Sequence, residues 1–272
     1  MRLCGTLLFL LAGATGMEIR DVIKAADIDA RFARTARDLA LHERPNYAIW
    51  LKVHSGRAGP YEVHRDADDV LWVRRGAATV LLGGELTGAG LAGARRHEIS
   101  AGDVVHIPRN TPHRIDPGAG RLEYVVVRIF PTGDNLPPRP GFLAPRIMPE
   151  VLKKSEIDAT IAKFDANQPI HAAKNYTMNY VIYKGRSGPF EAHHGCVDIY
   201  FIQFGAARAL LGGEIENPKE ESPGEIRGAG VKGSREYTIG PGDLVVIPRN
   251  GTHHMIPTSE KLGYILLKVW AE

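Results

Sequence analysis

The sequence has few cysteines, no dense cluster of basic residues and no long apolar run. Only two of its 272 residues are cysteine, Cys4 and Cys196. Because Cys4 lies in an N-terminal stretch that we expect to be absent from the mature protein, no intrachain disulfide can hold the fold. The net charge is +3, and the densest basic pairs are Arg74-Arg75 and Arg95-Arg96. This is too little positive charge for a nucleic-acid-binding face, so we expect no nucleic-acid partner.

The most apolar stretch lies near the N-terminus and is short. Arg2 supplies a positive charge, residues 7–14 are apolar, and small residues close the segment. This layout is typical of a secretory signal and is too short to cross a bilayer. We therefore predict that residues 1–17 are a signal peptide, that the protein is secreted or periplasmic, and that it has no membrane partner. If Met17 is instead the true start, the protein is cytoplasmic.

Glycine and proline are plentiful, and the chain repeats itself. Thirty glycines and eighteen prolines favour a turn-rich, all-β architecture. Residues 21–30 match residues 150–159 without a gap. The offset between matching positions of the two copies is 129 residues at first and 140 residues further along the chain. The second copy therefore has eleven extra residues, placed in residues 215–227, which we expect to form an exposed and mobile loop.

The repeat predicts two domains, residues 18–135 and 136–272, with residues 131–145 as the linker. Each copy opens with an amphipathic stretch, residues 27–39 and residues 156–163, that predicts a short helix. Short apolar runs separated by Gly and Pro follow, and these indicate the strands of a closed β-structure.

A set of spaced polar residues recurs in both copies. The first motif is Gly56-x5-Glu62-x-His64-x4-Asp69-x6-Gly76, and it recurs as Gly185-x5-Glu191-x-His193-x4-Asp198-x6-Gly205. The second motif is Gly102-x5-Pro108-x-Asn110-x2-His113, and it recurs as Gly242-x5-Pro248-x-Asn250-x2-His253. Together they resemble the two signature motifs of the cupin superfamily, over nearly the whole of residues 18–272. The resemblance implies an all-β fold of tandem double-stranded β-helix (jelly-roll) barrels with short flanking helices.

The resemblance also implies a metal site inside each barrel. Carried over by position, the ligands are Glu62, His64, Asp69 and His113 in the first barrel, and Glu191, His193, Asp198 and His253 in the second. The chain departs from the family pattern twice in each barrel, with Glu in place of the first His and Asp in place of the Glu. Side chains at positions i and i+2 of a strand share a face, so Glu62 and His64 can both point into the barrel.

Two interpretations of this residue set remain open. Mixed nitrogen and oxygen ligands suit a divalent transition metal such as Fe, Mn, Ni or Zn. The alternative is a metal-free barrel, in which the same side chains pair with one another or with a sugar or an organic acid.

Two functions from different classes follow. The first is a metal-dependent enzyme, similar to cupin dioxygenases, decarboxylases or isomerases, that acts on a small polar molecule. The second is a non-catalytic protein that binds or stores a sugar, a small acid or a metal. Both have a small-molecule partner, and the sequence leaves open whether the protein is catalytic. Dimers are common in the family, so the resemblance also allows a homodimer.

Overall fold

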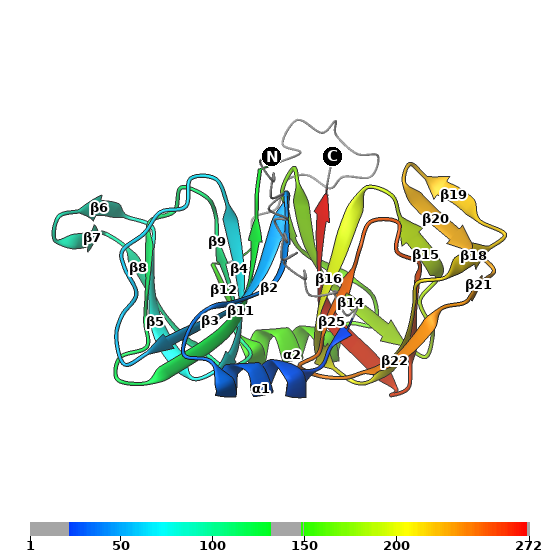
Figure 1. The fold of residues 1–272 in the computed structure, drawn as a ribbon, viewed down its shortest axis with the longest axis horizontal. Coiled ribbons are helices and arrows are strands. Elements are labelled where there is room, and N and C mark those ends of the chain that lie inside the picture. Colours follow the sequence, from blue (N-terminus) through cyan, green and yellow to red (C-terminus); the bar gives the residue numbers. More distant parts are fainter. Residues whose placement is uncertain (1–21, 132–147, 149, 271–272) are drawn as a thin grey trace, which may run out of the picture.

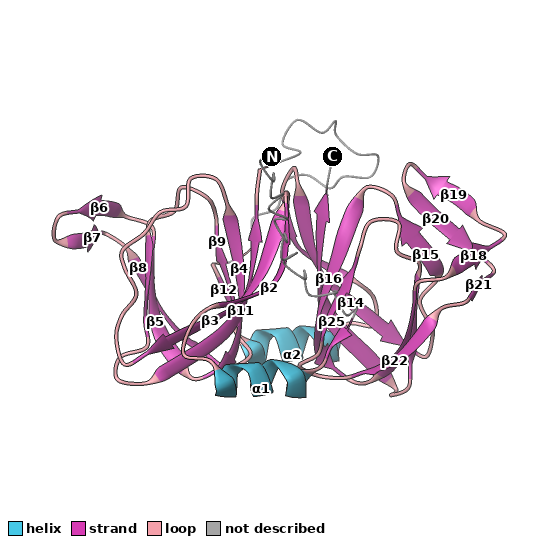
Figure 2. Cartoon of the chain, viewed as in Figure 1, coloured by secondary structure: helices cyan, strands magenta, loops and turns pink. Residues whose placement is uncertain are grey.

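The computed structural model describes residues 22–131, 148 and 150–270, and it contains two β-barrels lying side by side (Figures 1 and 2). The prediction of an all-β fold with short flanking helices is confirmed. The predicted signal peptide, the boundary at residue 135 and almost all of the predicted linker lie outside the described residues. Within the described part of the chain, no helix is long and apolar enough to cross a membrane.

The first barrel is built from two facing sheets and a small hairpin. The larger sheet has the order β12 (Val151–Leu152), β9 (Val104–Ile107), β4 (Asp68–Arg75), β11 (Arg121–Ile129), β3 (Tyr47–Ser55) and β2 (Leu39–Arg44). The smaller sheet has the order β10 (His113–Asp116), β5 (Ala77–Leu82) and β8 (Arg95–Ser100). The hairpin of β6 (Glu85–Thr87) and β7 (Gly90–Ala92) projects from its outer end.

The second barrel has the same plan with a larger outer sheet. Its inner sheet has the order β1 (Val22–Ile23), β23 (Leu244–Ile247), β16 (Cys196–Phe204), β25 (Lys261–Trp270), β14 (Tyr176–Lys184) and β13 (Gln168–Ala172). Its outer sheet has the order β19 (Lys219–Ser222), β20 (Glu225–Gly228), β15 (Phe190–His193), β24 (His253–Pro257), β17 (Ala207–Leu211) and β22 (Arg235–Ile239). A further pair joins β18 (Glu214–Glu216) to β21 (Gly230–Lys232).

Two predictions about local structure need correction. The first helix, α1 (Ala25–Arg34), ends earlier than predicted, because Leu39 already begins β2. The second, α2 (Lys154–Lys163), agrees with its predicted end. The extra residues of the second copy form strands β19 and β20 and part of β18 rather than an irregular loop. Strand β19 is exposed as expected, but β20 pairs with β15 and so joins the barrel wall.

The first strand of each repeat pairs with a sheet of the other barrel. Strand β1 pairs with β23 of the second barrel, whereas β12 pairs with β9 of the first. The helices are anchored in the same reciprocal way, because Asp243 accepts a hydrogen bond from the backbone N–H of Ala25, and Asp103 accepts one from that of Lys154. A carboxylate at a helix N-terminus satisfies free N–H groups and complements the helix dipole. Asp103 and Asp243 therefore tie the two barrels together.

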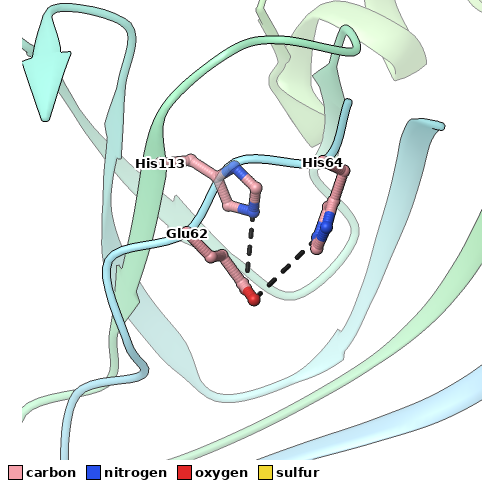
Figure 3. A group of neighbouring side chains, drawn as sticks. All are labelled: Glu62, His64 and His113. Carbon is pink, nitrogen blue, oxygen red and sulfur yellow. Dashed lines mark ion pairs between the residues drawn. The ribbon is translucent and has the colours of Figure 1, made fainter. Parts of the chain in front are cut away.

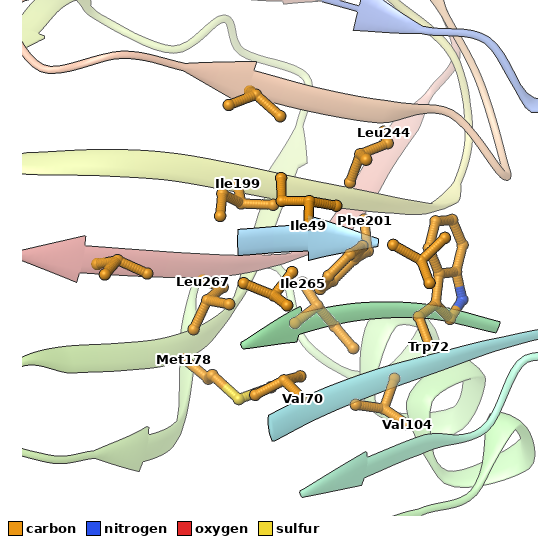
Figure 4. Close-up of a cluster of buried hydrophobic side chains, with 14 of the residues drawn as sticks. Ile49, Val70, Trp72, Val104, Met178, Ile199, Phe201, Leu244, Ile265 and Leu267 are labelled. Atoms are coloured by element: carbon orange, nitrogen blue, oxygen red, sulfur yellow. The ribbon is translucent and has the colours of Figure 1, made fainter. Parts of the chain in front are cut away.

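The largest apolar core lies between the barrels rather than inside either one (Figure 4). It combines residues of the two inner sheets, among them Val70 and Trp72 from β4 with Ile199 and Phe201 from β16. The rings of Trp72 and Phe201 lie 5.0 Å apart between centroids. Alternate residues on these strands face this shared core, so the residues between them face the barrel interiors.

Candidate metal centres

In each barrel, a cross-strand pair places one glutamate beside one histidine. Glu62 and His113 form an antiparallel bridge, with backbone N–H to O distances of 3.0 and 2.9 Å. Glu191 of β15 faces His253 of β24 in the same way. Directly opposed residues have neighbouring side chains, so each pair meets on the inner face of the barrel.

The third residue of each set is the histidine two positions after the glutamate. The carbonyl of His64 accepts a hydrogen bond from the backbone N–H of Asn110, and that of His193 accepts one from Asn250. Both asparagines have positive φ angles, 62° and 63°. Asparagine is one of the few residues that adopt this left-handed conformation readily.

The side chains of Glu62, His64 and His113 converge in the first barrel (Figure 3). Nε2 of His113 lies 3.4 Å from Oε1 of Glu62, and Nε2 of His64 lies 3.9 Å from Oε2 of the same carboxylate. The ligand atoms of the three residues all lie within 4.8 Å of one another. Two atoms bound at about 2.1 Å to one ion are at most about 4.2 Å apart, so small movements would bring all three onto a common ion.

The second barrel forms the matching group. Nε2 of His253 lies 3.3 Å from Oε1 of Glu191, and His193 completes a set whose ligand atoms are within 4.8 Å of one another. In both barrels a backbone carbonyl orients the second-motif histidine: Nδ1 of His113 donates to Thr111, and Nδ1 of His253 donates to Gly251. These bonds keep Nδ1 protonated and turn Nε2 towards the glutamate, as in many metal-binding histidines.

The two aspartates are near the sites but outside these groups. Asp69 is the cross-strand neighbour of Arg128, whose Nε and Nη2 donate to its carboxylate at 2.8 and 2.7 Å. Asp198 is the cross-strand neighbour of Lys268, with 3.8 Å between Nζ and Oδ1. Each aspartate also lies near the first-motif histidine, at 3.6 Å from His64 and 3.4 Å from His193. In this arrangement each carboxylate pairs with a cation, and the predicted role of the aspartates as ligands stays a prediction.

The glutamate and second-motif histidine of each barrel form a charged pair. The hydrogen bond from His113 lowers the pKa of Glu62. Burial acts to lower the pKa of His113, but Glu62, the carbonyl of Thr111 and Asp69 together outweigh it and raise that pKa. In the second barrel, burial opposes the ionisation of Glu191 and His253, yet their mutual attraction lowers the pKa of the first and raises that of the second. A metal ion that binds Nε2 must therefore displace a proton, so we expect metal binding to weaken at acidic pH.

A divalent metal ion fits these residues. Nε2 of His253 is buried and has no aligned hydrogen bond, and buried polar atoms in native proteins normally have a partner. An ion at the centre of the group would provide that partner. One carboxylate and two imidazoles are also the donor types that borderline divalent metals accept.

Three further residues contact these groups and were not predicted from the sequence. Arg128 donates from Nη2 to Nε2 of His64 at 2.8 Å as well as to Asp69. Lys268 lies 3.8 Å from both Asp198 and Glu225. Glu225 brings Oε2 to 2.8 Å from Nδ1 of His193. Arg128 and Lys268 align in the repeat, 140 positions apart, and this is the signal that could have identified them. Glu225 comes from the extra residues, so the repeat gives no signal for it.

The two barrels differ in access to their sites. In the first barrel the Glu62 side chain is 42% exposed and that of His64 21%. The corresponding values in the second barrel are 15% for Glu191 and 7% for His193. Three buried tyrosines, Tyr183, Tyr200 and Tyr264, fill the interior of the second barrel, where the first has His54, Leu71 and Tyr124. The first site is therefore open and the second enclosed.

Comparison with known proteins agrees with this architecture. The family model of the cupin domain matches residues 49–128, which lie in the first barrel. No curated protein matches the chain in sequence.

Several solved structures share the fold at low sequence identity. A cupin 2 conserved barrel domain protein from Leptotrichia buccalis is 12% identical, with a TM-score of 0.62 over 93% of this chain and 98% of its own. Salicylate 1,2-dioxygenase from Pseudaminobacter salicylatoxidans is 12% identical, with a TM-score of 0.61 over 91% and 83%. Oxalate decarboxylase from Lactobacillus farciminis, solved as a formate complex, is 15% identical, with a TM-score of 0.51 over 86% and 81%. These likenesses establish the fold.

Proposed function

We propose that the protein is a metal-dependent cupin enzyme acting on a small polar molecule, because its first barrel matches the family model of the cupin domain and the chain shares its fold with a cupin barrel protein. The observation that carries the proposal is the convergence of Glu, His and His in each barrel. Two proteins of similar fold act on oxalate and on salicylate according to their names. Small carboxylic acids are accordingly the substrate class we propose first.

We assign substrate binding to the first barrel. Its triad is the more exposed, and it carries a guanidinium group beside the ligand His64. Arginine recognises planar carboxylates through paired hydrogen bonds. In the present arrangement Arg128 gives those bonds to Asp69, so a substrate carboxylate would bind beside this pair or compete with Asp69 for it.

The residues of the first barrel have separate tasks in this proposal. A bound metal ion would supply a Lewis acid that polarises the substrate. Glu62, His64 and His113 would hold that ion, and Glu62, the most exposed of the three, could detach to exchange a proton with the substrate or with water. Arg128 offsets negative charge that enters the barrel.

A second function, binding without turnover, is favoured by one observation. The second barrel is enclosed, and its interior is filled by tyrosines, with ring centroids of Tyr200 and Tyr264 only 4.5 Å apart. An enclosed triad of this kind suits an ion that is held rather than exchanged. The second barrel would then act as a metal-holding or structural unit.

Metal content tests the proposal. We expect the purified protein to contain up to two equivalents of a divalent metal by elemental mass spectrometry, with His113→Ala and His253→Ala each losing the metal of one barrel. The loaded protein is then screened for oxygen consumption and carbon dioxide release with a panel of small carboxylic acids. We expect His113→Ala to abolish turnover, because it empties the open site.

The outcomes separate the alternatives. A wild-type protein that takes up no metal after incubation with iron, manganese, nickel and zinc in turn contradicts the metal site. Stoichiometric metal without any turnover supports the binding function. Circular dichroism of each variant shows whether a lost metal reflects a lost ligand or a lost fold.

A further inference from the structure

The first-motif histidines of the two barrels have different neighbours. Nε2 of His64 accepts a hydrogen bond from the guanidinium of Arg128 at 2.8 Å. A guanidinium can only donate, so the lone pair of that nitrogen is engaged. Nδ1 of His193, by contrast, lies 2.8 Å from a carboxylate oxygen of Glu225, close enough for electrostatic attraction although the two groups are not aligned for a hydrogen bond. Among the described residues, no carboxylate contacts Nδ1 of His64.

Glu225 reaches this position through the extra residues of the second copy. It begins β20, and the register of β20 with β15 pairs it directly with His193. Strand β20 is also held by β19. Lys268 lies 3.8 Å from the Glu225 carboxylate and offsets its charge. The first barrel has no strand in this place, since the eleven residues are missing there.

We propose that Glu225 positions His193 for metal binding and makes the second barrel the tighter of two metal sites. This inference rests on the proposed metal-dependent function. The carboxylate favours the tautomer with the proton on Nδ1, which leaves the lone pair of Nε2 for an ion. Carboxylates that orient metal-binding histidines in this way raise the basicity of the ring and fix its orientation. In the first barrel an ion must instead displace Arg128 from His64 and bind beside its positive charge.

The two sites should therefore differ in affinity in a metal titration. The full-length protein is stripped with a chelator and titrated with zinc against a chromophoric competitor. We expect one tight and one weak class of site in the wild type. Glu225→Gln should weaken the tight class 10–100-fold and leave the weak class unchanged. His64→Ala should remove the weak class alone.

A matched control comes from the same segment. Glu216 lies on β18 and pairs with Lys232 at the surface, away from the triad, so Glu216→Gln should bind zinc like the wild type. The thermal midpoint of the metal-free protein should be similar in both variants. If Glu225→Gln instead lowers that midpoint without changing zinc affinity, the residue is structural and the proposal is wrong.

The remaining outcomes distinguish this inference from the proposed function. Two classes of equal affinity, or a tight class that disappears in His64→Ala, overturn the assignment while leaving metal binding intact. A wild-type protein that binds no zinc, and none of the other metals, overturns both. The absorption spectrum of a cobalt-loaded protein gives a further readout, since Glu225→Gln should alter the bands of the tight site only.

Discussion

The two barrels present the same three side-chain types, one Glu and two His, in different surroundings. In the first barrel the triad is open, and Arg128 contacts His64. In the second the triad is enclosed, tyrosines fill the interior, and Glu225 contacts His193. The motif residues are shared, so the difference comes from residues outside the motifs. A repeated set of side chains therefore does not imply a repeated environment, because access and neighbouring charge differ between the two copies.

The largest predicted effect tests whether the barrels can be compared as separate units at all. Phe201 is fully buried in the core between them and touches Trp72. We expect Phe201→Ala to reduce the free energy of unfolding by about 3–5 kcal/mol and to leave a single unfolding transition. Chemical denaturation followed by tryptophan fluorescence and circular dichroism measures both.

The control lies three residues further along the same strand. Phe204 is 50% exposed, so Phe204→Ala should change stability by no more than about 0.5 kcal/mol. Two separate transitions in Phe201→Ala would mean that the barrels fold independently, despite the exchange of β1 and β12.

The next prediction compares the cations of the two sites. Arg128 donates two hydrogen bonds to the buried Asp69, and removing one partner of a buried pair leaves an uncompensated charge. We expect Arg128→Met to cost about 3 kcal/mol of stability. Lys268 stands farther from Asp198, at 3.8 Å, so Lys268→Met should cost less, about 1–2 kcal/mol. Denaturant midpoints of the metal-free proteins measure the loss of stability in each variant. Equal losses would show that Arg128 and Lys268 contribute equally to stability and would contradict the prediction.

The smallest effect concerns pH and a histidine that only the first barrel has. The pKa of His106 is lowered to about 3, mainly by burial and in addition by the neighbouring His171. Nε2 of His106 lies 2.7 Å from the hydroxyl of Tyr176, and its ring centroid is 4.6 Å from that of His171. In the second barrel Val246 takes its place.

The sign of the pH effect follows from this lowered pKa. Between pH 6.5 and about 3 the unfolded chain binds a proton at His106 that the folded protein does not, so stability falls as the pH falls through this window. His106→Val should therefore show a shallower loss of stability from pH 7 to pH 5, measured with urea in the presence of a chelator. The raised pKa values of His113 and His253 act in the opposite direction, and comparing variant with wild type removes their contribution. An unchanged slope would contradict the prediction.

Part of this molecule follows from its sequence. Glu62 and His64 are two residues apart on an extended segment, so strand periodicity alone puts them on one face. The second motif identified His113 as the histidine that belongs with them, and the spacing of Gly and Pro indicated an all-β fold. Even the departures from the family pattern were visible, since Glu62 and Glu191 stand at the corresponding positions of the two copies.

The surroundings of the sites did not follow from local pattern. Arg128 meets Asp69 because strands β11 and β4 pair in one register. The extra residues were expected to be a mobile loop, because a segment rich in Glu, Pro and Gly has no apolar face to bury. Pairing with β15 supplied backbone hydrogen bonds that the composition does not reveal, and it brought Glu225 to His193.

The sequence by itself determined the fold class and the Glu, His and His of each barrel, because the two repeated motifs specify them. Only the tertiary structure decided which strands the two copies exchange, which site is open, and which charge stands beside each histidine. Those features depend on strand register and on contacts between distant segments. The free energy of such contacts is set by neighbours that no local pattern specifies.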